Sequence, residues 1–132
     1  MDCRSNSARI TVVVTSLPMQ TANTIIVLFL AVVFLISGLY KASGSAAGLS
    51  GTRDVKVPDG LARLIGMLET LSALSLIVGF ALDNSDLQIY GLIAIWFTMA
   101  GAIYFHFRAN KVRTAFPAML LLIIATLGIA SI

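Results

Sequence analysis

The sequence contains only one cysteine and one histidine, and both scarcities exclude kinds of site. With Cys3 alone, the chain cannot form an intramolecular disulfide, a CxxC redox pair or a cysteine-based metal site. With His106 alone, one chain cannot supply the two axial ligands of a bis-histidine haem. We therefore expect no metal site. The sequence predicts no cofactor, with quinone left open as an alternative, and it leaves enzymatic activity undecided while favouring a chain without catalytic activity on its own.

Charged residues are also scarce, at 11%, whereas hydrophobic residues make up 58% of the 132 positions. Soluble domains average about 25% charged residues, so this composition and the mean hydropathy of +0.96 are typical of an integral membrane protein. The net charge of +3 does not indicate nucleic-acid binding, because the basic residues are few and lie near helix ends. The length predicts one domain.

Four long uncharged or nearly uncharged stretches predict four membrane-spanning helices, since about 20 apolar residues cross a bilayer. The predicted spans cover about 24–41, 60–82, 87–107 and 114–132. The short polar turns Asp83–Asp86 and Arg108–Arg113 require antiparallel neighbours. The predicted fold is an all-α, integral membrane, antiparallel four-helix bundle over residues 24–132.

The segment Ala42–Asp59 reads as a linker, small and flexible at first and then polar. Its last residue, Asp59, is predicted to be the N-cap of the second helix. Pro117 is tolerated near the start of the fourth helix because its missing N–H lies in the first turn.

Residues 1–23 form a predicted N-terminal tail whose role the sequence leaves open. Ile10–Leu17 is rich in β-branched residues, which suggests an extended or interfacial segment. One alternative is a signal peptide, with Ser43–Gly48 as a small-residue cleavage region. Another is that the native chain begins at Met19, because every predicted span follows that residue.

Basic residues set the orientation, because cytoplasmic loops are enriched in lysine and arginine. The 41–60 and 108–113 loops carry most of them, whereas the opposite side has the acidic turn at 83–86. We expect a multi-pass protein of the cell (inner) membrane with both basic loops cytoplasmic and both termini outside.

Glu69 places a carboxylate inside the second predicted span, where a charge is costly unless it is paired or faces the bundle interior. Helical spacing puts it on one face with Gly66 and Ala73, small residues that allow another helix to approach closely. The opposite face should meet lipid and carries Leu64, Met67, Leu68, Leu71 and Val78. Glu69 either stabilises helix packing or handles a ligand or protons.

Three polar residues from three helices should meet in the cytoplasmic half of the bundle. Lys41 ends the first span, Glu69 lies within the second and His106 closes the third. Tyr40 and Tyr104 are the expected hydroxyl partners. For Lys41 the simpler alternative is a side chain that extends to the lipid headgroups.

At these residues the chain resembles the DoxX family of small four-helix membrane proteins. The resemblance rests on FLISGLYKASG (Phe34–Gly44), VPDGLARLIGMLETLSALSLIVG (Val57–Gly79) and MAGAIYFHFR (Met99–Arg108), and it covers Ile25–Ile132. It implies the membrane location and the fold. Its small-residue motifs mark Gly38, Gly66, Ala73 and Gly101 as helix-packing positions, but it implies little chemistry.

Three functions fit these observations. The favoured one is a non-catalytic accessory or assembly partner of other membrane proteins, in which the polar cluster stabilises the fold and a partner surface. The alternative is a small subunit of a quinone-linked oxidoreductase or membrane redox complex, since some relatives are linked to such systems. A proton or solute pathway would require several copies, because four helices leave little lumen; a homo-oligomer thus stays open.

Overall fold

The structure is a computed structural model that describes residues 3–132, with side chains described from Pro18 onward, and every element in this part is helical. In chain order the elements are α1 (Cys3–Ala42), α2 (Ala46–Asp54), α3 (Asp59–Ala81), α4 (Ser85–Arg108), the 3₁₀-helix η1 (Val112–Ala115) and α5 (Phe116–Ser131). Four segments are long and apolar enough to cross a membrane: Pro18–Ala42, Asp59–Ala81, Ser85–Arg108 and Val112–Ser131. The prediction of an all-α, four-helix membrane bundle is confirmed.

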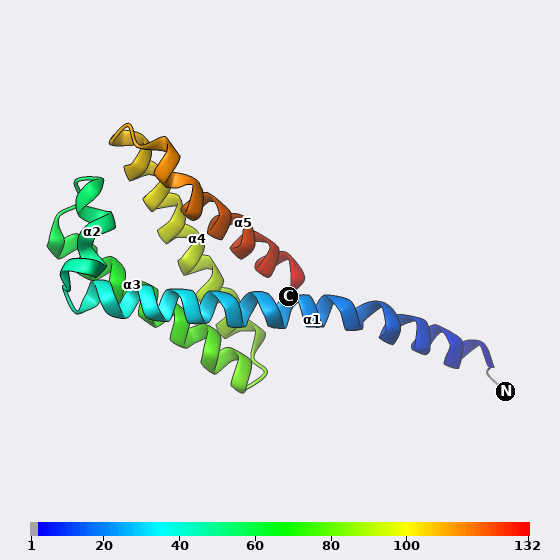
Figure 1. Cartoon of the computed structure of the whole chain (residues 1–132). Helices are drawn as coiled ribbons and strands as arrows, with labels where there is room; N and C mark the ends of the chain where they lie inside the picture. Colours follow the sequence, from blue (N-terminus) through cyan, green and yellow to red (C-terminus); the bar gives the residue numbers. More distant parts are fainter. Residues whose placement is uncertain (1–2) are drawn as a thin grey trace.

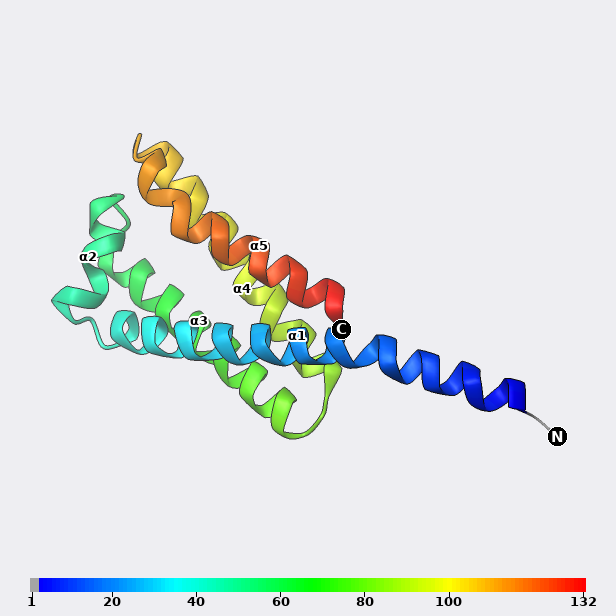
Figure 2. The ribbon, with the colours of Figure 1, turned by 45° about the vertical axis from the view of Figure 1, so that its right-hand side comes forward.

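The four long helices form a ring in which α1 packs on α3, α3 on α4, α4 on α5, and α5 on α1. Figures 1 and 2 show that the pair α4 and α5 diverges from the pair α1 and α3 toward the end of the bundle where α2 lies. The helices are therefore close together at one end and splayed at the other.

The core of the bundle is built from apolar side chains of all four helices, including Leu30, Phe34, Leu76, Leu92 and Ala125. The predicted lipid-facing side of α3 is exposed in the isolated chain, as expected for a surface that hydrocarbon covers in the membrane. Its members are Leu64, Met67, Leu68, Leu71 and Val78.

Helix α1 is 40 residues long and so measures about 60 Å at 1.5 Å per residue, twice the thickness of a bilayer core. Its N-terminal part extends beyond the bundle (Figure 1). The segment Ile10–Leu17 belongs to this helix, so the expectation of an extended segment is wrong. The preference of β-branched residues for strands is weak evidence on its own, and here the helix of the first span continues through this segment.

The segment between α1 and α3 is not the flexible linker predicted from its composition, because α2 occupies half of it. Ser45 caps this helix by accepting a hydrogen bond from the Gly48 N–H at 3.1 Å. Leu49 anchors it in a second small core with Val57 and Ala62. This end of the bundle therefore carries a folded element that packs on α1 and α3.

Asp59 is not the N-cap of α3, because Pro58 holds that position and Asp59 lies in the first turn. Its carboxylate instead accepts hydrogen bonds from Arg53 Nε at 2.9 Å and Nη2 at 2.7 Å. This bidentate contact raises the pKa of Arg53 and ties the end of α2 to the start of α3. At the other end of the chain, Pro117 lies in the first turn of α5, as predicted.

Candidate functional site

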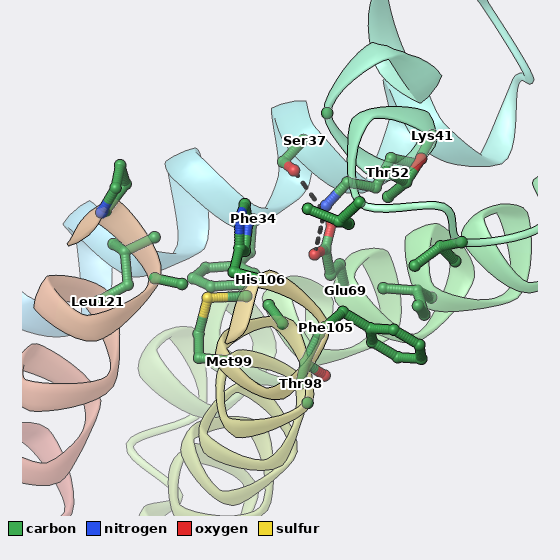
Figure 3. Close-up of a pocket in the computed structure, with 18 of the residues that line it drawn as sticks. Phe34, Ser37, Lys41, Thr52, Glu69, Thr98, Met99, Phe105, His106 and Leu121 are labelled. Atoms are coloured by element: carbon green, nitrogen blue, oxygen red, sulfur yellow. Dashed lines mark hydrogen bonds and ion pairs between the residues drawn. The ribbon is translucent and has the colours of Figure 1, made fainter. Parts of the chain in front are cut away.

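Glu69 is the most deeply buried charged residue among the described side chains, with 1% of its surface exposed. It lies about 15 Å along α3 from Asp59, and both of its carboxylate oxygens are bound by α1. Lys41 Nζ donates to Oε1 at 2.7 Å, and Ser37 Oγ donates to Oε2 at 3.0 Å (Figure 3). The predicted partner Lys41 is therefore in place, and a buried carboxylate is neutralised and hydrogen-bonded as burial demands.

Two facing glycines bring α1 and α3 close enough for this contact. A Cβ at Gly66 would lie 2.6 Å from the Ala42 nitrogen, and one at Gly38 would lie 2.7 Å from the Gly66 carbonyl oxygen. Ala73, with 0% exposure, continues the same face of α3. Gly38, Gly66 and Ala73 are thus at close-packed positions of the kind expected between membrane helices.

His106 does not contact the Lys41–Glu69 pair directly. Its Nδ1 lies 2.8 Å from Thr114 Oγ1 on η1, and Thr114 Oγ1 in turn lies 2.7 Å from the Lys111 carbonyl oxygen, to which it donates. The short turn after α4 therefore folds back on the end of that helix. This contact fixes the orientation of the imidazole ring.

Lys41, Glu69 and His106 nevertheless line one cavity of about 470 Å³. All four long helices and the α2 segment contribute to its wall, which is mostly apolar and includes Phe34, Met99 and Leu121 (Figure 3). The cavity lies where α4 and α5 diverge from α1 and α3. The structure thus assembles the three predicted polar residues around a shared space rather than in one hydrogen-bonded cluster.

Three other predicted residues do not have the roles expected of them. Tyr40 and Tyr104 are 55% and 61% exposed, so neither hydroxyl is a partner of the ion pair. Helix rotation explains this, because neighbouring positions along a helix point in different directions. Gly101 is not a close-packing position either: a Cβ there would meet nothing within 4 Å, and the residue lines the cavity.

Two hydrogen-bond partners of the predicted site residues were not predicted as members of the site. Ser37 lies four positions before Lys41, so helical spacing alone places both on one face of α1. Thr114 directly follows the predicted turn Arg108–Arg113, and this turn is short enough for the Thr114 hydroxyl to contact His106.

The comparisons with known proteins bear on this arrangement. The model of the DoxX-like family matches residues 25–127, a range that contains Lys41, Glu69 and His106, the second and third spans, and most of the first and fourth. No curated protein and no solved structure matches the chain.

Proposed function

We propose that this chain, which belongs to the DoxX-like family, acts as a non-catalytic accessory or assembly partner of other membrane proteins. The observation that supports this function is that each carboxylate oxygen of Glu69 already has a hydrogen-bond donor. Both carboxylate oxygens are already bound by α1, and the residue is 1% exposed, so the acid serves first to hold α1 against α3. A carboxylate held in this way stabilises the geometry of a helix pair.

The apolar outer faces supply the surface that such a role needs. Leu64, Met67 and Leu71 on α3 are all more than half exposed in the isolated chain, and lipid or the helix of another membrane protein would cover them. Locking α1 to α3 keeps these side chains in a fixed arrangement. Another membrane protein or a second copy of this chain is the proposed partner.

We propose a location in the cell (inner) membrane with the α2 end of the bundle in the cytoplasm. This end carries Lys41, Arg53, Lys56, Arg63, Arg108, Lys111 and Arg113, which favours the cytoplasmic side by the positive-inside rule. Both ends of the chain would then lie outside.

Purification of the tagged chain from its native membrane in mild detergent tests the accessory function. We expect a complex larger than the monomer, with a membrane partner that is retained in Glu69→Gln and reduced in Glu69→Leu. Gln keeps the side-chain shape and most hydrogen bonds, whereas Leu strands Lys41 and Ser37. Isolation as a monomer from native membranes would argue against the proposal.

A deletion strain adds a second test. If Glu69→Gln has a normal melting temperature in detergent but fails to complement the deletion, the acid does chemistry beyond packing. Lys41→Met and His106→Ala should then fail in the same way. Normal complementation by all three variants would support a purely structural acid.

The second candidate function is a small membrane subunit of a quinone-linked oxidoreductase or redox complex. The observation that favours it is the cavity of about 470 Å³ beside Lys41, which is large enough for a lipid-soluble head group. A quinone carbonyl would accept a hydrogen bond from the Lys41 amine. Extraction of the purified protein, with absorbance and lipid analysis for bound quinone or flavin, tests this candidate.

A further inference from the structure

The polar groups of the cavity indicate the head-group chemistry of the molecule that would fill it. Its volume of about 470 Å³ lies within the ~300–1,000 Å³ typical of small-molecule sites, which combine apolar walls with a few oriented polar groups. Leu68 and Phe97 line it and are 48% and 67% exposed on the outer surface of the bundle. The cavity is therefore accessible to a molecule dissolved in the membrane.

Lys41 supplies hydrogen-bond donors to this space. Its ammonium group has three N–H donors, of which one is directed to Glu69 Oε1 at 2.7 Å. The side chain remains 20% exposed, although Glu69 is 1% exposed. Because the two charges cancel, the pair favours a neutral head group that contains an acceptor oxygen.

His106 supplies an acceptor, and its hydrogen bonds show which nitrogen. The single hydroxyl hydrogen of Thr114 is used in the bond to the Lys111 carbonyl. The contact between His106 Nδ1 and Thr114 Oγ1 must therefore be donated by Nδ1–H. In the neutral ring this leaves a lone pair on Nε2, for which the described part of the chain offers no donor.

We propose that the cavity binds a neutral lipophilic molecule with a hydroxyl head group. The hydroxyl hydrogen would be donated to His106 Nε2, and the same oxygen or a neighbouring one would accept from Lys41 Nζ. An ether, an ester or an oxidised quinone offers acceptors only and would leave Nε2 without a partner. This inference rests on the cavity and does not depend on the accessory role.

A pair of matched probes tests the proposal: 4-octylphenol and its methyl ether, 4-octylanisole, which share the ring and the tail. Binding to the full chain in lipid nanodiscs should be at least tenfold tighter for the phenol, because one buried hydrogen bond of about 1.4 kcal/mol is worth that factor. Equal affinities, or no saturable binding of the phenol, would overturn the proposal.

Gly101→Leu provides the control for partition of the probes into the lipid. A Cβ at this position meets nothing within 4 Å, so a leucine side chain has room to begin there and can extend into the cavity. We expect this variant to fold and to lose saturable binding of the phenol. Unchanged binding would show that the phenol binds elsewhere and would overturn the assignment to this cavity.

The role of His106 is tested by His106→Phe, which keeps a ring but removes Nε2. It should lower the affinity for the phenol to that for the anisole and leave the anisole unchanged. Tyr104→Phe is the matched control, because it removes an exposed hydroxyl from the same helix and should keep the tenfold preference. A preference retained in His106→Phe refutes the hydrogen bond to Nε2. If that variant does not fold, the probe pair on the wild-type chain still decides.

Discussion

Alanine at Gly66 and at Gly101 should have opposite effects on stability, although both glycines lie inside membrane helices. At Gly66 the new Cβ would lie 2.6 Å from the Ala42 nitrogen, 2.6 Å from Lys41 Cβ and 2.8 Å from the Gly38 oxygen. Ordinary contacts between such atoms need about 3.5–4.0 Å. Two of the three atoms belong to the backbone, so α1 itself has to move by about 1 Å.

The magnitudes can be compared directly. Overpacking of this kind costs typically 1–3 kcal/mol, and alanine recovers about 1 kcal/mol of helix propensity. Separation of the helices also lengthens the contact between Lys41 and Glu69, now 2.7 Å, which adds to the cost. We expect Gly66→Ala to lose about 2 kcal/mol, and Gly101→Ala, whose Cβ meets open space, to gain about 0.5–1 kcal/mol.

Thermal unfolding of the full chain in one detergent, followed by circular dichroism, measures the contrast. Gly60→Ala is the control on α3, because a Cβ there also meets nothing within 4 Å. The melting temperature should fall by several degrees for Gly66→Ala and should not fall for the other two variants. If Gly66→Ala is as stable as Gly101→Ala, α1 and α3 are not in close contact at Gly66.

Three further predictions concern topology, the start of the chain and the buried acid. Cysteines introduced at Ser50 and Asn110 should react only with reagents on the cytoplasmic side, and one at Ser85 only with external reagents. External labelling at Ser50 in intact cells would show that the orientation is the opposite of the one proposed. A chain that begins at Met19 should insert and accumulate like the full sequence, and a loss of membrane protein on immunoblots would show that the preceding segment is required. Glu69→Leu should be less stable in detergent than Glu69→Gln by about 1–3 kcal/mol for each stranded partner, and equal melting temperatures would contradict its role in packing.

The four spans were predictable because hydropathy and length alone define a membrane helix. The Lys41–Glu69 contact was predictable for a related reason: an intramembrane carboxylate requires a partner, and antiparallel topology brings the end of the first span beside the second. Helix α2 was not predictable, because its composition is that of a loop. Its stability comes from tertiary contacts, chiefly the burial of Leu49, and from the Ser45 cap.

A stricter use of helical periodicity would have excluded the tyrosines as partners of the Lys41–Glu69 pair. Lys41 shares its face with Ser37 and Phe34, at offsets of four and seven, whereas Tyr40 shares the exposed face of Ile36. Gly101 is a different matter. Whether a glycine in a membrane helix meets a neighbour or a cavity depends on where the next helix lies, and one helix's sequence does not contain that information.

The glycines along α4 show why the cavity and the polar residues occur at the same end of the bundle. A Cβ at Gly91 would lie 2.9 Å from the Ser72 carbonyl oxygen, so α4 touches α3 there, whereas one at Gly101, ten positions on, meets nothing within 4 Å. The helices diverge toward the end that contains Gly101 (Figures 1 and 2), and the cavity at that end is lined by Lys41 and His106. At the tightly packed end a buried donor needs a protein partner, as Gln88 Nε2 has in the Gly79 carbonyl oxygen at 3.3 Å. At the splayed end, two N–H donors of Lys41 and the second ring nitrogen of His106 have no partner among the described residues, and in our proposal these are the groups that would bind the ligand.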